Sequence, residues 1–368
     1  MTLLKTDWSP VTTFLDSAVA AGAAPGAVLG VTVAGNRFVY ATGRLERNQS
    51  APAEPTTVYD LASLTKVVAL STAAMLAVDD GKLDLDLPVH RYLPAFADKG
   101  KARVTSRMLL AHASGLPAWR PLFREAGTRA EAFALAIGTP LDSLPGAAAV
   151  YSDVGMIVLT HVIEKLYQER LDSLLQRRIF QPLGMTSIRF LPAPGQQARI
   201  APTELDPRRG RLLRGEVHDE NAARLDGVSG HAGLFGSVPD LLTFAEWMLA
   251  GGPADGRTVG LTEHFDPPAV SPSVLREFTR RQDLVPGSTR ALGWDTPSAG
   301  SSAGRLLSPA SFGHTGFTGT SLWIDPSRRL GIVLLSNRVS PSRENASWTP
   351  VRAAINDLVM TTLFEDTR

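Results

Sequence analysis

Tyr59-Asp60-Leu61-Ala62-Ser63-Leu64-Thr65-Lys66 is the stretch in which a hydroxyl and an amine are brought to the same side of a helix. Apolar residues recur at helical spacing after it and end at a glycine, so we expect a buried helix over residues 64–80. Ser63 then lies in the first turn, where unpaired backbone N–H groups favour negative charge, and Lys66 lies one turn further on. Because a nearby amine can take the proton of a serine hydroxyl, this spacing predicts a Ser/Lys acyl-transfer centre.

The surroundings of Lys66 distinguish this interpretation from a common alternative, a helix-capping serine followed by a solvated lysine. The predicted helix is apolar on nearly every side, which is typical of an internal helix, and a lysine inside it must be paired or neutral. Neutrality at pH 7 would require the pKa of Lys66 to fall by roughly three from about 10.4, at a cost on the order of 4 kcal/mol.

Length and composition restrict the classes of function. The 368 residues suffice for a large core and two lobes; 44% of them are hydrophobic, 20% are charged, and the formal net charge is +1. This balance indicates a small or neutral substrate rather than a nucleic acid or an acidic partner. Because the sequence contains no cysteine, disulfides, thiolate catalysis and cysteine-ligated metals are excluded.

The sequence as written carries no targeting or membrane signal. Residues 1–10 include Lys5 and Asp7 but no apolar segment, so they do not resemble a signal peptide, and no apolar run approaches the length of a membrane span. We therefore expect a cytoplasmic protein, unless a leader has been removed. We expect that the protein binds no membrane and no nucleic acid, and that it has no obligate protein partner.

Strand-like segments lie near both ends of the chain, and helical patterns fill the middle. Residues 26–33 and 38–42 flank a hairpin turn, residues 316–325 and 330–337 form a similar pair, and residues 350–364 form a final amphipathic helix. This order predicts an α+β fold in which helices flank an antiparallel sheet made from both termini, with an all-helical lobe inserted in it. The expected domains are a discontinuous sheet domain (1–62 and 226–368) and a mainly helical domain (63–225).

Helix-breaking residues and capping patterns define the remaining segments. Ser237, with Asp240 three residues later, is interpreted as a capping pair that opens a helix ending near Ala250. Residues 191–216 are rich in proline, arginine and glycine and show little periodicity, so they are predicted to form a long surface excursion. Further helices are expected at residues 11–21, 106–112, 128–137, 153–168 and 171–180.

Two further clusters contain polar residues that a hydrolase needs. Tyr151-Ser152-Asp153 opens a predicted helix, and Gly313-His314-Thr315-Gly316 enters a predicted strand. Together with Ser63-x-x-Lys66, in this order and with these wide gaps, they resemble the three motifs of the class C β-lactamase and D,D-peptidase superfamily of serine hydrolases. Residues 217–235, 336–339 and 343–345 are also similar to the penicillin-binding-protein 4B-like branch, and an esterase-like branch is the other candidate.

This resemblance implies a β-lactamase/D,D-peptidase-like fold and a role for each matching residue. Ser63 would be the acylated nucleophile, Lys66 its proton acceptor or the charge that tunes it, and Tyr151 the group that exchanges protons with the leaving group and with water. The oxyanion would be held by the backbone N–H groups of Ser63 and Phe317, and Gly316 would permit close backbone approach. Substrate contacts are expected from the remaining candidates, Asp153, Thr315, Gly316, Arg343 and Asn345, with His314 among the catalytic residues.

Two positions depart from the motifs that these families share. Asp153 stands where asparagine is common, so an ionised side chain could only accept hydrogen bonds, and it would favour a charged Lys66. His314 stands where many members have lysine, and a histidine titrates near neutrality, so we expect activity to change across pH 6 to 7 if its charge contributes. These departures favour hydrolysis of an ester or small amide, or slow D,D-peptidase activity, over efficient β-lactamase activity.

Several alternatives remain open at the level of sequence. The general base is either Lys66 or Tyr151, and the two are expected to titrate as a unit. A penicillin-binding sensor or a pseudoenzyme would share the same motifs without turnover. His231 is as consistent with loop packing as with substrate contact. We expect no cofactor and no metal site, because His218 has no second histidine at ligand spacing.

Overall fold

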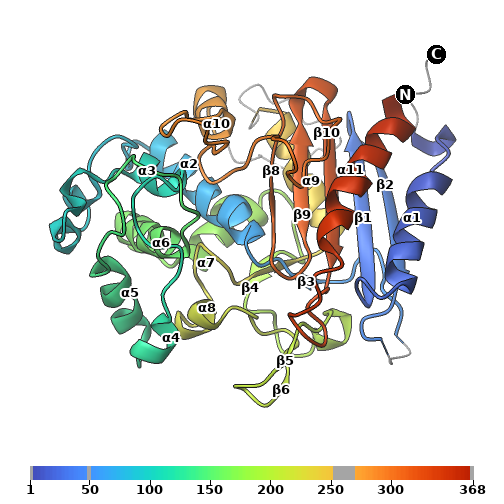
Figure 1. Ribbon diagram of the computed structural model, residues 1–368, viewed down its shortest axis with the longest axis horizontal. Helices are drawn as coiled ribbons and strands as arrows, with labels where there is room; N and C mark the ends of the chain where they lie inside the picture. The colour runs from blue at the N-terminus through green and yellow to red at the C-terminus, as the bar shows by residue number, and fades with distance from the viewer. Residues whose placement is uncertain (1–2, 48–50, 252–269, 365–368) are drawn as a thin grey trace.

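The computed structural model of the protein describes residues 3–47, 51–251 and 270–364. A five-stranded antiparallel sheet lies at its centre, in the strand order β2-β1-β10-β9-β8 (Figure 1). Strands from both ends of the chain are neighbours in it, as predicted, because β1 pairs with β10 along its length. The strands are β1 (Gly26–Val33), β2 (Asn36–Gly43), β8 (Phe312–Thr315), β9 (Ser321–Asp325) and β10 (Leu330–Ser336).

Side chains that alternate along β1 supply a core on each face of the sheet. Leu29 faces one core, which is covered by α1 (Ser9–Ala20) and α11 (Thr349–Phe364). Val28 faces the other core, which includes the buried face of α9 (Val238–Leu249). Figure 1 shows α1 and α11 on the side of the sheet that faces away from the helical lobe. The α+β class and the flanking helices are therefore as predicted.

The inserted lobe is mainly helical and lies on the opposite side of the molecule from α1 (Figure 1). Its helices are α2 (Thr72–Asp79), α3 (Ser106–Leu110), α4 (Leu122–Glu125), α5 (Arg129–Ile137), α6 (Asp153–Tyr167) and α7 (Leu171–Leu175). Two further helices, α8 (Glu220–Arg224) and α10 (Pro272–Thr279), lie beside them. Two small sheets join the lobe to the rest: β3 (Tyr59–Asp60), β7 (Leu234–Gly236) and β4 (Arg189–Phe190) form one, and β5 (Leu205–Asp206) and β6 (Arg211–Leu212) form the other.

The helix expected over residues 64–80 is present, but its first part is not α-helical. Lys66–Ser71 is π-helical and continues directly into α2. Both segments are almost completely buried, as the apolar pattern predicts. A π-helical turn is rare and occurs frequently at functional sites, and here it begins at the lysine of the first motif.

The strand predicted over residues 316–325 is wrong in its first half. The chain forms a turn between β8 and β9, closed by hydrogen bonds from Gly316 N–H to Thr320 O and from Gly319 N–H to Gly316 O, at 2.8 and 3.1 Å. Gly319 has a φ of +117°, which only glycine adopts easily, so the turn is built into the sequence. This turn projects from the sheet towards the loop that carries Ser63.

The capping pair predicted at the start of α9 does not form. Ser237 occupies the N-cap position without a side-chain cap, and Asp240 instead accepts hydrogen bonds from Ser187 and Ile188. The segment 191–216 is also more than a surface excursion, because it contains the β5–β6 hairpin and the buried carboxylate of Glu204. Partners distant in sequence override the local pattern in both places.

Within the described residues, no helix has both the length and the apolar character that crossing a membrane requires.

Candidate active site

Ser63 follows β3 in a tightly held loop and begins the buried helix. Asp60 Oδ1 accepts a hydrogen bond from the Ala62 N–H at 2.8 Å, and Ala62 has a φ of +46°, which is uncommon for a residue with a side chain. The carbonyl oxygen of Ser63 accepts from the Lys66 N–H at 3.0 Å, so Ser63 lies in the first turn as predicted. Its own N–H donates to no group among the described residues.

Lys66 is completely buried, and its ammonium group has three acceptors. Nζ lies 2.7 Å from Asp153 Oδ1, 2.9 Å from the carbonyl oxygen of His231 and 3.0 Å from Ser63 Oγ. Three acceptors match the three N–H donors of a charged lysine. Burial alone would lower the pKa of Lys66, but the Asp153 carboxylate and the Tyr151 phenol outweigh it and raise the pKa to about 12. The neutral Lys66 considered from the sequence is therefore not the resting state.

Tyr151 brings its hydroxyl to the same point from the segment before α6. The Lys66 ammonium lies 4.8 Å from the centre of its ring, and Tyr151 lines the same two cavities as Ser63. The ring contacts His112 on one side and His314 on the other, at centroid distances of 4.6 and 5.8 Å. Burial raises the pKa of Tyr151 above its usual value; Lys66 opposes this rise, and Asp153 adds to it. Tyr151 is therefore a phenol at rest.

The turn after β8 is fixed against the loop that carries Ser63. Thr318 Oγ1 donates to Asp60 O at 2.7 Å, and Thr320 Oγ1 donates to Leu61 O at 3.0 Å. A side chain at Gly316 would place its Cβ 2.5 Å from Leu61 O, so only glycine permits this approach, as the sequence predicts. Phe317 follows directly, and its N–H has no acceptor among the described residues.

His314 lies in β8 and is buried. Its Nδ1 lies 2.7 Å from the carbonyl oxygen of Thr315, which can only accept, so Nδ1 carries the proton and Nε2 is an acceptor. Nε2 has no partner among the described residues. Burial, reinforced by the charges of Lys66 and Arg290, holds the pKa of His314 well below its usual value. His314 is therefore neutral across pH 6 to 7, and the condition under which the sequence predicts a change of activity there, a contribution from its charge, is not met.

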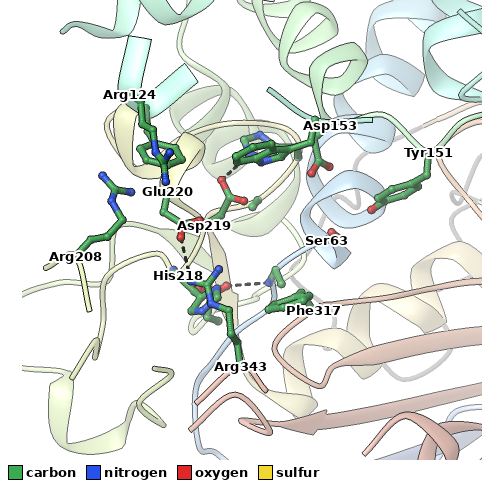
Figure 2. A pocket seen from close by; sticks show the side chains of 16 residues that line it. Ser63, Arg124, Tyr151, Asp153, Arg208, His218, Asp219, Glu220, Phe317 and Arg343 are labelled. Carbon is green, nitrogen blue, oxygen red and sulfur yellow. Dashed lines mark hydrogen bonds and ion pairs between the residues drawn. The ribbon is translucent and has the colours of Figure 1, made fainter. Parts of the chain in front are cut away.

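Two cavities meet at Ser63, and Ser63, Tyr151 and Phe317 line both of them. The first, about 450 Å³, is shown in Figure 2 and extends away from the sheet. The second, about 360 Å³, lies along β8 and the start of α11. Asp153 and Arg343 line the first cavity, and Thr315 and Gly316 line the second. The structure thus brings the three motif segments together around one hydroxyl.

Arg338 and Arg352 give the second cavity a positive charge, and Arg352 is the one that the sequence analysis missed. Each is 8% exposed, and their guanidinium groups donate only to backbone carbonyls: Arg352 to Gly316 O at 2.5 Å, and Arg338 to Phe317 O at 2.8 Å. Neither has a carboxylate partner among the described residues. Burial and the charge of Arg338 lower the pKa of Arg352 to about 10, so it stays charged at neutral pH. An arginine on the buried face of the final helix was the available signal.

Arg343 and Asn345 were both predicted to contact substrate, but only Arg343 lies at a cavity. Arg343 is at the first cavity, but its guanidinium is already paired with Glu204 and Glu220 at 2.7 and 2.9 Å. Asn345 lies at neither cavity, because its amide donates to the carbonyl oxygens of Gly22 and Ala23, both at 3.1 Å. The expectation that Asn345 contacts substrate is therefore wrong, since this amide ties the segment after β10 to the turn before β1.

The structure shows which groups the backbone and the ring of His231 contact. Its carbonyl oxygen is one of the acceptors of Lys66, while its ring lies between Asp219 Oδ1, at 2.8 Å, and Ser229 Oγ, at 2.7 Å. Burial would raise the pKa of Asp219, but His231 and Lys66 hold it well below its usual value. The glycine-rich run therefore contributes to the site through its backbone.

Comparisons with known proteins identify the family of this chain. The sequence profile of the Beta-lactamase family matches residues 11–357. A protein of Salmonella typhimurium, provisionally named a D-alanyl-D-alanine carboxypeptidase, is 35% identical over 328 residues, which are 80% of this chain and 72% of that protein.

Solved structures show the same fold at lower sequence identity. A penicillin-binding protein homologue from Caulobacter crescentus is similar with a TM-score of 0.75 and 18% identity over 97% of both chains. A class C β-lactamase from Rhodobacter sphaeroides is similar with a TM-score of 0.71 and 22% identity, over 95% of this chain and 99% of that chain. With nearly the whole chain matched by the family profile and the three motif segments converging on Ser63, the chain belongs to the Beta-lactamase family.

Proposed function

We propose that the protein is a serine hydrolase that forms an acyl-enzyme at Ser63 on a small ester, an amide or a D-alanyl peptide. The observation that carries the proposal is the position of Ser63 Oγ, 3.0 Å from the Lys66 ammonium and at the two cavities that Tyr151 also lines. The free N–H groups of Ser63 and Phe317 offer a place for an oxyanion beside it. Such a pair of donors stabilises a transition state by several kcal/mol, of the order of 3 for each donor.

In the proposed mechanism Tyr151 is the general base and Lys66 a fixed cation. Lys66 has no free lone pair, because its raised pKa keeps the amine protonated, and each of its N–H groups already has an acceptor. The phenolate form of Tyr151, stabilised by that ammonium, takes the proton of Ser63 while Oγ forms a bond to the substrate carbonyl carbon. The carbonyl oxygen becomes an oxyanion held by the two N–H groups. Tyr151 then returns the proton to the leaving group as its bond to carbon breaks.

Deacylation repeats these steps with water. Tyr151 removes a proton from a water molecule that attacks the acyl carbon, and then gives that proton to Ser63 Oγ as the ester bond breaks, so that the acid product leaves and the starting state returns.

The second cavity favours an acyl donor with a carboxylate near the scissile bond. His314 supplies no charge there, but Arg338 and Arg352 provide two buried cations without carboxylate partners among the described residues. This arrangement weakens the preference for simple esters that the sequence suggested and supports a D,D-peptidase activity. The name of the Salmonella relative supports the same substrate class.

Arg352→Gln should lower kcat/KM for an N-acyl-D-alanyl-D-alanine by about tenfold or more, because a charge-assisted hydrogen bond to the terminal carboxylate is lost. The measurement is steady-state hydrolysis of that dipeptide and of its C-terminal amide. The amide is the control, and its kcat/KM should change less than about threefold. Equal losses for both substrates would contradict carboxylate recognition and would indicate that Arg352 acts only by holding Gly316.

The proposed base predicts an alkaline pH dependence. The active form is the phenolate of Tyr151, whose pKa is raised, so kcat/KM should increase about tenfold per pH unit from pH 6 to at least 9. His314 is neutral throughout this range, so no break is expected between pH 6 and 7. A D-alanyl peptide is a suitable substrate because it is stable to alkali. A break near pH 6.5 that His314→Gln removes would contradict this expectation.

Asp153→Asn is the matched test of the same prediction. Asp153 raises the pKa of Tyr151, so removing its charge should lower that pKa and shift the rising limb to lower pH. Activity at pH 7 should then increase relative to the optimum of the same variant. An unchanged profile would show that Tyr151 does not set the pH dependence.

Intact mass after exposure to penicillin and to a short-chain ester tests the function itself. An adduct that appears and decays with release of product is the expected result for a hydrolase. A persistent adduct with every acyl donor would instead favour a penicillin-binding sensor. No adduct with any donor would favour a pseudoenzyme and would overturn the proposal.

A further inference from the structure

The first cavity contains four carboxylates, and each of them has partners. They are Asp153 with Lys66, Asp219 with the ring of His231, Glu220 with Arg343, and Asp60 with the N–H groups of Ala62 and His218. Asp153 and Glu220 have cationic partners, and Asp219 and Asp60 are held by hydrogen bonds. These acids are therefore occupied in holding the site together.

Two cations of the same cavity, Arg124 and Arg208, differ from these acids in their contacts. Arg124 belongs to α4 and Arg208 to the β5–β6 turn, yet both guanidinium groups lie over the ring of Phe123, at 5.3 and 3.8 Å from its centre. Within the described chain, neither guanidinium makes a hydrogen bond or an ion pair. Both side chains are exposed to the cavity. Two separate segments thus bring like charges to one ring without a counterion, which suits an anionic ligand.

The arginine pair lies at the far end of the cavity from the nucleophile. Figure 2 shows Arg124 and Arg208 on one side and Ser63 and Tyr151 on the other. Trp119 and Phe317 also line this cavity and are 48% and 49% exposed, so they offer apolar surface to a bound ligand. An acyl chain attached to Ser63 could lie along this aromatic surface with its far end at the arginines.

We propose that Arg124 and Arg208 form a distal anion subsite, which selects acyl donors that carry a carboxylate at the far end of the acyl chain. This subsite rests on the proposed function, because it places the acyl group of the substrate in the first cavity. It is separate from Arg338 and Arg352, which face the second cavity. The competing interpretation is that the two arginines only cover Phe123.

Matched esters test the subsite. p-Nitrophenyl monoesters of adipic, suberic and sebacic acid carry a terminal carboxylate, and their methyl-capped forms are neutral with the same chain. The ratio of kcat/KM for the charged ester to that for the neutral ester should fall about tenfold in Arg124→Gln/Arg208→Gln at the best chain length. The kcat/KM for the neutral ester should stay within about twofold, and 1 M salt should also lower the ratio in the parent protein.

Control variants separate charge from packing. Arg124→Lys/Arg208→Lys keeps both charges and should recover much of the ratio, whereas Arg276→Gln, an exposed arginine on α10, should not change it. An unchanged ratio in the double Gln variant, or equal losses for charged and neutral esters, would overturn the subsite and leave only a covering role over Phe123.

Binding to the Ser63→Ala protein separates failure of the subsite from failure of the hydrolase proposal. Calorimetric titration with p-nitrophenyl hydrogen suberate should show binding about tenfold weaker when Arg124→Gln and Arg208→Gln are added. This result supports the subsite even if the parent protein turns over neither ester, an outcome that would count against the hydrolase function alone. Equal affinity of the two proteins would overturn the subsite even if hydrolysis is fast.

Discussion

Ser63→Ala is expected to form no adduct with penicillin or a short-chain ester and to lose at least about ten thousandfold in kcat/KM. The variant removes the only oxygen that the proposed mechanism acylates. Lys66 keeps two strong acceptors, Asp153 Oδ1 at 2.7 Å and His231 O at 2.9 Å, so its buried ammonium remains satisfied. The fold should therefore survive, and the loss should be chemical rather than structural.

Intact mass and ester hydrolysis measure this effect, and a melting curve checks the fold. Ser273→Ala, an exposed serine on α10, is the matched control and should behave like the parent protein. An adduct that still forms in Ser63→Ala, mapped by peptide digestion to another residue, would show that the nucleophile has been assigned wrongly.

Tyr151→Phe is expected to slow acylation by about a thousandfold, within the range found when a proton-transfer group is lost. The reason is specific to this site: Lys66 donates to three acceptors and has a raised pKa, so it cannot take over as base. The ring contacts with His112 and His314 are retained in phenylalanine, so packing should change little. Stopped-flow acylation by a chromogenic acyl donor gives the rate.

Tyr59→Phe provides the control for removing a phenolic oxygen. The hydroxyl of Tyr59 is buried and has no hydrogen-bond partner among the described residues, so its loss should leave acylation unchanged. Normal acylation in Tyr151→Phe would contradict the assignment of the base. The proton would then have to pass through Lys66, and acylation in Lys66→Ala would decide that alternative.

Much of the fold could be predicted because it depends on local patterns. Apolar spacing identified the buried helix after Ser63 and the final helix, and strand-like runs beside turn residues identified β1 and β10. The predicted strand over residues 316–325 failed in its first half because the turn made by Gly316 and Gly319 also contains Phe317 and two threonines, residue types that favour strands, and leads directly into β9. The capping pair at Ser237 failed because Asp240 has distant partners in Ser187 and Ile188.

The sequence predicted which residues form the candidate site better than it predicted the charges within that site. Ser63, Lys66 and Tyr151 meet as their motifs imply, and Gly316 approaches Leu61 as closely as expected. Arg352 was missed because its place on the buried face of the final helix indicates that it is enclosed but not which cavity it lines. Asn345 was wrongly placed at the site because it is close to Arg343 in the sequence. Its amide donates to the Gly22 carbonyl oxygen instead, and only Arg343 lines the cavity.

By itself, the sequence determined which residues could form the acyl-transfer centre, the order in which their segments occur, and the sheet built from both termini. Ser63, Lys66 and the sheet follow from residue type and periodicity along the chain, and the other members follow from the resemblance of the three motifs to a known superfamily. Only the tertiary structure decided that Lys66 is charged, that His314 is neutral, and that Arg338 and Arg352 supply the positive charge beside it. The physical reason is that a protonation state depends on burial and on the charges within a few ångströms, and here those charges come from residues far apart in the sequence.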